Sequence, residues 1–385
     1  MSSDIAAFPS PRLRMVACRS GPYHEALAKY AGLCCSGRSA LYHALASARL
    51  PRGATVWMPA FHCGVEVDAA VRAGFNVGFY RVAPDLSCDV EDLERRLRER
   101  HGSALVVHYY GFPQPSISSL AALCRGRGAL LIEDCAHALF SQDQERQLGQ
   151  YAPLAVFSLR KTLPLLEGGA YQWNDRAWMD TGAHGAFAGL ARFSVDPYRL
   201  YAKCLARQIV GRKATDLYRM LRWGGLQDRE EAPPPGQREE IYRSRMSALS
   251  RRLAAATAPD EVVERRRRNW VGLDARLNGV PGYQKVFNKL EKGVCPLFLP
   301  IWVSGRSMLM ARLREQGIET FAFGTLAHPL LPQTRFPEAA RLRESILCLP
   351  VHQQIRESDL DRMSAAVSGL LGRHSQGPLH ACAVG

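Results

Sequence analysis

The stretch Val156-Phe-Ser-Leu-Arg-Lys-Thr-Leu-Pro-Leu-Leu-Glu-Gly-Gly169 places a single lysine, Lys161, between an apolar, strand-like entry and an acidic glycine turn. A lysine that bonds to an aldehyde cofactor must lie where its amine can lose its proton. Apolar neighbours such as Leu159 and Leu163 would desolvate the amine, and Arg160 would repel its positive charge. Lys161 is therefore the candidate reactive residue, and a solvated Arg-Lys pair on a loop is the alternative.

A second stretch, Ala129-Leu-Leu-Ile-Glu-Asp-Cys-Ala-His137, is an apolar run that ends in two acids. The four apolar residues predict a buried parallel strand with Asp134 at its carboxyl end. Open α/β sheets bind their ligands at this end. A carboxylate there can pair with the protonated ring nitrogen of pyridoxal phosphate, and we predict this role for Asp134. A capping residue for the next helix is the alternative.

These stretches resemble those of the DegT/StrS-type nucleotide-sugar aminotransferase family, which are fold-type-I pyridoxal-phosphate enzymes. Four further motifs resemble the family in the same order along the chain: Ser36-Gly-Arg-Ser-Ala-Leu41, Met58-Pro-Ala-Phe-His-Cys63, Val107-His-Tyr-Tyr-Gly-Phe112 and Ile346-Leu-Cys-Leu-Pro-Val-His352. The resemblance implies an α/β three-layer sandwich with a mostly parallel sheet, of the aspartate-aminotransferase type, and a smaller α+β C-terminal domain. The alternation of strand and helix patterns over residues 55–132 independently predicts such a sandwich.

The resemblance also implies which residues hold pyridoxal 5′-phosphate. Besides Lys161 and Asp134, the matching positions are Ser39 and Ala40 in a phosphate turn, His62 and Cys63 beside the ring, His137 near the phenolic oxygen, Ser158 at the phosphate, and Arg243 reaching from a partner subunit. The small-residue turn at Ser39 offers helix N–H groups to a phosphate, and a serine cap without any ligand is the alternative.

Several of these positions depart from the family pattern. Cys63 stands where relatives have an aromatic residue that stacks on the ring, so we favour His62 for stacking, with Phe61 as the alternative. Arg243 replaces an asparagine, and the turn between Ser158 and the Glu-Gly-Gly segment is shorter than in relatives. His352 matches a position close to the substrate, with a structural histidine as the alternative.

We expect four parts along the chain. These are an N-terminal arm over residues 1–30, a large pyridoxal-phosphate-binding domain over residues 31–245, a small C-terminal domain over residues 246–373 and a disordered tail over residues 374–385. Residues 196–240 form a divergent basic helical excursion with a proline-rich linker, for which we predict a subunit contact, with a membrane surface as the alternative. We also expect one long helix over residues 246–277 and a strand over residues 318–321.

Composition limits the classes of protein to consider. The chain has 385 residues, 47% of them hydrophobic, and no apolar run approaches the roughly 20 residues that span a bilayer. Without a signal-peptide pattern, a cytoplasmic location is expected. The 11 cysteines include no C-x-x-C pair, so no metal site is predicted. The formal net charge of +14 comes without a nucleic-acid-binding signature, and we interpret it as serving an anionic substrate, with solubility as the alternative.

The predicted function is that of a pyridoxal-phosphate-dependent aminotransferase. It would move an amino group from an amino acid such as glutamate to a keto sugar, nucleotide-linked, in cell-surface polysaccharide or secondary-metabolite biosynthesis, as a homodimer with shared active sites. Lys161 would be both covalent anchor and general acid/base. One alternative is a dehydratase or other lyase on the same cofactor, a branch in which histidine replaces the lysine. A non-catalytic regulatory or membrane-associated relative is the other, which Cys63 and the divergent region leave open.

Overall fold

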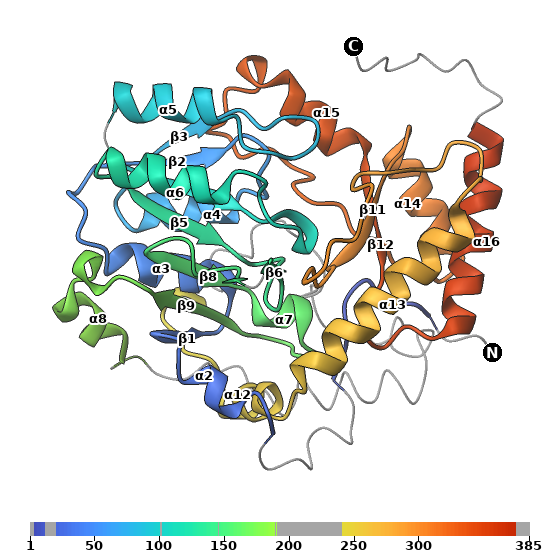
Figure 1. The fold of residues 1–385 in the computed structure, drawn as a ribbon, viewed down its shortest axis with the longest axis horizontal. Helices are drawn as coiled ribbons and strands as arrows, with labels where there is room; N and C mark the ends of the chain where they lie inside the picture. Colours follow the sequence, from blue (N-terminus) through green and yellow to red (C-terminus); the bar gives the residue numbers. More distant parts are fainter. Residues whose placement is uncertain are drawn as a thin grey trace, which may run out of the picture.

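The computed structural model describes residues 4–11, 21–100, 102–144, 146–188, 190 and 241–374. Within these residues the chain forms a seven-stranded sheet and a three-stranded sheet, both flanked by helices (Figure 1). The predicted excursion over residues 196–240 lies outside the described residues, as do residues 375–385 of the predicted tail. None of the helices in the described part of the chain is long and apolar enough to cross a bilayer.

The large sheet has the strand order β1-β9-β8-β5-β4-β2-β3. All pairs from β8 to β3 are parallel, whereas β9 is antiparallel to both β8 and β1. This arrangement confirms the predicted α/β fold with a mostly parallel sheet. The strands are β1 Gly32–Cys34, β2 Thr55–Pro59, β3 Asn76–Tyr80, β4 Gly102–Val107, β5 Leu130–Asp134, β8 Leu154–Phe157 and β9 Gly169–Trp173.

Helices alternate with these strands, as expected for a sheet that is covered on both faces. All six residues of β4 are buried, which explains why the central strands are continuous apolar runs. The helices of this part are α2 His24–Leu27, α3 Gly37–Ala46, α4 Val65–Arg72, α5 Val90–Glu99, α6 Ile117–Gly126, α7 Leu159–Thr162 and α8 Thr181–Ala188. A short hairpin, β6 Gln142–Asp143 and β7 Arg146–Gln147, follows β5.

The second sheet is antiparallel and lies in the C-terminal half of the chain. It consists of β10 Gln284–Lys285, β11 Phe298–Trp302 and β12 Ile346–Pro350. Its helices are α13 Pro259–Leu277, α14 Arg306–Glu315, α15 Pro337–Ser345 and α16 Glu357–His374, of which α13 and α16 run side by side (Figure 1). One apolar core extends from the large sheet into this lobe, and the predicted domain boundaries stay predictions.

Two predicted elements need correction. The expected long helix over residues 246–277 is two helices, α12 Ala248–Ala255 and α13, because Pro259 lacks an N–H and starts a helix, while Ala258 before it is extended. The expected strand over residues 318–321 is reduced to two isolated bridges, Ile5–Ile318 and Phe321–Cys348. The N-terminal arm therefore pairs with the C-terminal lobe.

Candidate active site

Predicted site residues meet at the carboxyl edge of the large sheet. In the strand register Asp134 lies beside Val107 on one side and Val156 on the other. Directly after β8 come Ser158 and the one-turn helix α7, which carries Lys161. Because these strands are parallel, their ends bring side chains that are distant in sequence to one edge.

Lys161 forms a direct contact with His137. Its Nζ lies 3.0 Å from His137 Nε2, and the backbone N–H of Tyr110 donates to Nδ1 of the same ring at 3.3 Å. Burial, with a smaller effect from the charge of Lys161, lowers the pKa of His137 well below its ordinary value, so the ring is neutral. A neutral ring whose Nδ1 accepts carries its proton on Nε2. The Nε2–H of His137 is therefore placed to donate to the Lys161 amine.

Aromatic rings surround this amine. The rings of Phe321 and Phe323, from the C-terminal lobe, each have their centroid 6.0 Å from Lys161 Nζ. The ring of Phe323 packs edge-on against the His137 ring, with 5.0 Å between their centroids. The ring of Tyr110 stacks on the same imidazole, with 5.6 Å between centroids. The two phenylalanine rings thus place apolar surface next to the half-buried Lys161. Sequence reasoning missed both phenylalanines, because nothing local indicates that this loop reaches Lys161.

Among the described residues, no cationic side chain forms a hydrogen bond with the Asp134 carboxylate. One oxygen, Oδ1, accepts the backbone N–H of Ala136 at 2.8 Å. Burial and, to a smaller extent, the nearby charge of Glu66 raise the pKa of Asp134, whereas the Ala136 bond and the charge of Lys161 lower it, and the net value is about 6. Glu66 is a buried residue of α4 that sequence reasoning also missed. A protonated ring nitrogen would supply the positive charge that Asp134 lacks.

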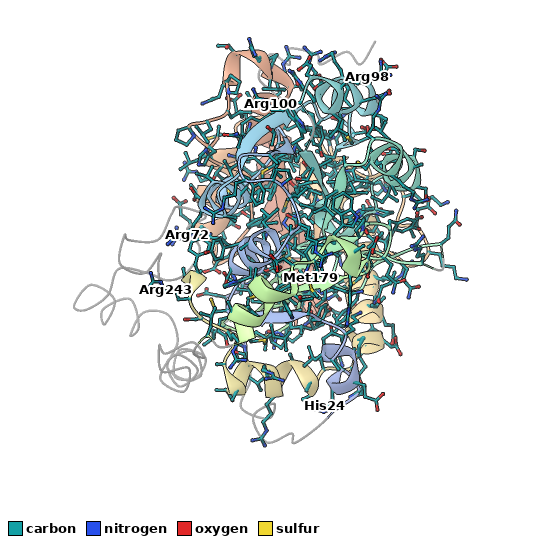
Figure 2. The ribbon with its side chains drawn as sticks, turned by 90° about the vertical axis from the view of Figure 1, so that its left-hand side faces the viewer. His24, Arg72, Arg98, Arg100, Met179 and Arg243 are labelled. Carbon is teal, nitrogen blue, oxygen red and sulfur yellow. The ribbon has the colours of Figure 1, made fainter. Side chains whose placement is uncertain are left out.

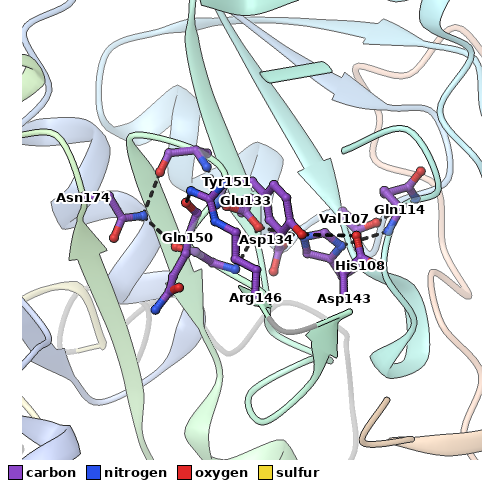
Figure 3. A network of polar contacts seen from close by, with 12 residues as sticks. Val107, His108, Gln114, Glu133, Asp134, Asp143, Arg146, Gln150, Tyr151 and Asn174 are labelled. Atoms are coloured by element: carbon purple, nitrogen blue, oxygen red, sulfur yellow. Dashed lines mark hydrogen bonds and ion pairs between the residues drawn. The ribbon is translucent and has the colours of Figure 1, made fainter. Parts of the chain in front are cut away.

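Next to Asp134, Glu133 and His108 belong to a buried network of hydrogen bonds at the carboxyl ends of β5 and β4 (Figure 3). Glu133 Oε2 lies 3.0 Å from His108 Nε2, while Gln114 donates its N–H to the other nitrogen of this ring at 3.1 Å. The Glu133 carboxylate also accepts three backbone N–H groups, at 2.8, 2.6 and 2.7 Å, from Gly149, Tyr151 and Ala152. His108, Glu133 and Cys135 are close enough to hold a metal ion. Because Glu133 already accepts four hydrogen bonds, we assign this cluster a structural role.

The predicted phosphate turn is the start of α3. Ser36 caps the helix: its Oγ accepts the N–H of Ser39 at 3.1 Å, and its carbonyl accepts the N–H of Ala40 at 2.9 Å. The N–H groups of the two predicted residues, Ser39 and Ala40, are thus used inside the turn, and the Ser39 side chain is fully buried. The first N–H groups of the helix, on Gly37 and Arg38, are the ones available to a phosphate.

Glycines let this turn pack directly on the Lys161 segment. A Cβ added to Gly37 would lie 3.2 Å from Ser158 Cβ, and one added to Gly169 would lie 2.2 Å from the backbone carbon of Ser36. Ser158 itself is buried at this contact. The turn, Ser158 and the glycines therefore form a small cradle at the same sheet edge as Lys161 and Asp134.

Replacing Gly169 with alanine is expected to destabilise the protein by about 1–3 kcal/mol, the usual cost of overpacking, because the added Cβ would meet the backbone of Ser36. Gly126→Ala is the matched control, since Gly126 lies at the end of α6 with nothing within 4 Å of its added Cβ. Urea unfolding of both variants measures the difference. Equal stabilities would contradict the close approach.

The loop after β2 holds the two candidate ring contacts. His62 is fully buried, with Nδ1 donating to the Pro59 carbonyl at 3.0 Å and its ring stacked on Phe79 at 5.1 Å; burial lowers its pKa to about 4. Cys63 is only half-buried, and its thiol donates to Glu66 at 2.9 Å. This arrangement turns His62 into the core, so Cys63 is the better candidate to contact a cofactor ring, and the predicted stacking by His62 gains no support.

The last two predicted site residues are Arg243 and His352. Arg243 is exposed, on the same side of the molecule as Arg72, whose guanidinium covers the Tyr242 ring at 4.6 Å (Figure 2). His352 is buried, donates from Nε2 to the Ala6 carbonyl at 3.0 Å and accepts the N–H of Gln354 at 3.3 Å. His352 thus holds the N-terminal arm, which favours its structural alternative.

Comparison with known proteins bears on this site. Residues 21–203 match the model of the DegT/DnrJ/EryC1/StrS aminotransferase family. This part of the chain, a little under half of its length, is similar to that family. A GDP-perosamine synthase of Vibrio cholerae is 31% identical over 37% of the chain, a match that spans only 39% of that synthase. The pleiotropic regulatory protein of Geobacillus stearothermophilus is 23% identical over 86% of the chain and 82% of its own length.

Solved structures support the DegT-type fold. Helicobacter pylori PseC, described as an aminotransferase involved in the biosynthesis of pseudoaminic acid, superposes with a TM-score of 0.71 over 96% of this chain and 100% of PseC, at 14% identity. At that identity the likeness shows the fold alone.

Pyridoxal 5′-phosphate is the cofactor that DegT-type aminotransferases use, and the residues present fit it. Asp134 is a carboxylate whose pKa is raised by burial, the Lys161 amine is held as an acceptor, and the glycines leave helix N–H groups beside Ser158. A carboxylate, a free amine and an anion site match the ring nitrogen, aldehyde and phosphate of this cofactor.

Proposed function

We propose that this protein is a pyridoxal-phosphate-dependent aminotransferase that moves an amino group from an amino acid, with glutamate as the first choice, to a keto sugar carried by a nucleotide. The observation that carries the proposal is the 3.0 Å contact between Lys161 and a neutral, buried His137 at the sheet edge where Asp134 ends β5. The name of the GDP-perosamine synthase supports a nucleotide-linked sugar as the acceptor. Biosynthesis of cell-surface polysaccharides or secondary metabolites is the expected setting.

In this proposal each residue has a defined task. Pyridoxal phosphate, when bound, supplies an aldehyde carbon and an electron-withdrawing ring. Lys161 Nζ would hold the aldehyde carbon and would carry a proton from and back to the substrate. Asp134 would hold the ring nitrogen in its protonated form. The N–H groups of Gly37 and Arg38 would bind the phosphate with Ser158, and Phe323 would cover one side of the amine.

Charge and thiols fit this setting. A formal net charge of +14 attracts a nucleoside diphosphate to the protein. All eight cysteines in the described part of the chain are free thiols, which agrees with the reducing cytoplasm.

An absorption spectrum tests the proposal. Protein purified with pyridoxal phosphate should show a visible band that changes when glutamate is added, because the half-reaction converts the bound aldehyde to an amine. Other amino acids then identify the donor. Absence of a visible band at saturating cofactor, or no change with any amino acid, would contradict the proposal.

A regulatory role without catalysis is the second candidate. The near full-length match to a pleiotropic regulatory protein favours it, as does Cys63 in place of the ring-stacking aromatic residue. A protein of this kind would leave the spectrum unchanged on adding amino donors. The presence of Lys161 disfavours the dehydratase alternative, and analysis of the sugar product for an amino group separates the two enzymes.

We also propose a homodimer in which Arg243 contacts the cofactor phosphate of the partner subunit. Arg243→Ala should then weaken cofactor binding by about 1.5–3 kcal/mol, the range for a hydrogen bond to a charged group, as measured by fluorescence titration. Arg72→Ala, at a nearby arginine, is the control. Heterodimers of Arg243→Ala and Lys161→Ala chains should regain activity, because one of their two sites has both residues intact. Verified heterodimers without activity would sink the shared site.

A further inference from the structure

Arg266, in the middle of α13, is the largest side chain that is fully buried in the described part of the chain, with 1% of its surface exposed. No carboxylate among the described residues forms an ion pair with it. Its partners are instead neutral oxygens: Nε donates to Gln353 Oε1 at 3.0 Å and Nη2 to the Thr162 carbonyl at 3.1 Å. Nη1 donates to the carbonyls of Pro296 and Leu297, at 3.2 and 3.1 Å.

A charge buried without a counter-charge is costly to keep. Desolvation lowers the pKa of Arg266 to about 10, and the group stays ionised. An apolar side chain would fill this space at lower cost, although it would leave the carbonyls unpaired. What only a guanidinium offers is a rigid fork of donors that fixes several chain segments at once.

One of these segments is the turn that carries Lys161. Thr162 ends α7, directly after Lys161, and the last carbonyl of a one-turn helix has no partner in a next turn. Here that carbonyl receives two donors, Arg266 Nη2 at 3.1 Å and Gln353 Nε2 at 3.0 Å. Arg266 and Gln353, which also bind each other, thus cap the Lys161 turn from the C-terminal lobe.

The other arm of the fork leads to His137. Arg266 Nη1 holds the Leu297 carbonyl, the Leu297 N–H donates to the Tyr110 carbonyl at 2.8 Å, and the Tyr110 N–H donates to His137 Nδ1. This one guanidinium is therefore connected to Lys161 through the carbonyl of the next residue, Thr162, and to His137 through three successive hydrogen bonds.

We propose that Arg266 is a positioning residue, which with Gln353 holds the Lys161 turn at the distance from His137 at which the amine accepts a hydrogen bond. The inference rests on the proposed function for the use of this amine, but not for the geometry that holds it. Arg266 acts through Thr162 and Leu297, to whose carbonyls it donates.

Chemical labelling of the cofactor-free protein tests the proposal. Trace acetylation by acetic anhydride over a pH series, measured at Lys161 by peptide mass spectrometry, reports how much amine is unprotonated. Arg266→Lys keeps the positive charge but lacks the forked N–H donors of the guanidinium. Gln353→Glu keeps an oxygen that accepts from Arg266 but lacks the N–H that donates to the Thr162 carbonyl. In both variants labelling of Lys161 at neutral pH should fall by about tenfold, which corresponds to one pH unit in its profile.

Arg267→Lys is the matched control. Arg267 also donates to two backbone carbonyls, those of Glu291 and Val294, but it does not contact Thr162. Its variant should keep the wild-type profile at Lys161. A melting temperature confirms that each variant is folded.

Wild-type labelling profiles in folded Arg266→Lys and Gln353→Glu would overturn the positioning role and leave these residues a structural one. Because labelling needs no cofactor, its outcome is separate from that of the glutamate spectrum. A shifted profile together with a silent spectrum would reject the aminotransferase and keep the positioning role.

Discussion

Replacing Lys161 with alanine is expected to abolish covalent attachment of pyridoxal phosphate and to lower the rate of transamination by about 10⁴-fold or more, the upper range for the loss of a general acid/base. The reason is that in the proposed function one amine serves two tasks, attachment and proton transfer, and no other described residue in contact with His137 offers an amine. Borohydride reduction of the wild-type protein with cofactor, followed by peptide mapping, should place the label on Lys161.

Lys289→Ala serves as the control, since Lys289 is exposed and, within the part of the chain that the structure describes, forms an ion pair only with Glu291 at 3.0 Å. It should keep both labelling and activity. A reduced cofactor on any lysine other than Lys161, or an active Lys161→Ala protein, would show that the short turn after Ser158 does not carry the reactive amine.

Asp134→Asn is expected to retain the cofactor but to lose about 10³-fold in transamination rate, comparable to removing a preorganised electrostatic contact in an active site. Asparagine keeps the shape and the contact with the Ala136 N–H, but it cannot stabilise a protonated ring nitrogen. Cofactor absorbance measures retention, and stopped-flow absorbance after glutamate addition measures the rate. A rate near that of the wild type would mean that another carboxylate, with Glu66 as the first candidate, pairs with the ring.

The pH dependence of the melting temperature of Asp134→Asn, measured without cofactor, is a second test of Asp134. Because burial raises the pKa of Asp134 to about 6 in the folded protein, its contribution to stability is complete below the ordinary value of 3.8 and is lost as the pH rises through 6. Asp134→Asn should therefore melt at a higher temperature than the wild type above pH 6, and the difference should shrink toward acidic pH. A constant difference at all pH values would show that Asp134 titrates normally.

The sequence alone predicted the parallel sheet and two of its functional ends. Apolar runs that stop at Asp134 and before Ser158 are local signals, and parallel strands bring their carboxyl ends to one edge whatever the rest of the chain does. The start of α3 was equally predictable, because Ser36 is a good N-cap and the glycine after it allows the close turn. The break at Pro259 was present in the sequence too, but the helical pattern on both sides concealed it.

Only the tertiary structure decided how these ends are used. His137 meets Lys161 because β5 and β8 pair in the large sheet, and His62 turns into the core against Phe79. Arg266 reaches Thr162 because the two lobes pack against each other over a large sequence separation. Burial and the identity of hydrogen-bond partners depend on that packing, and they set both the proton on His137 and the charge cost at Asp134. A local pattern can place a titratable group at the end of a strand. The exposure of that group to solvent and the identity of its neighbours depend on segments that the pattern does not contain.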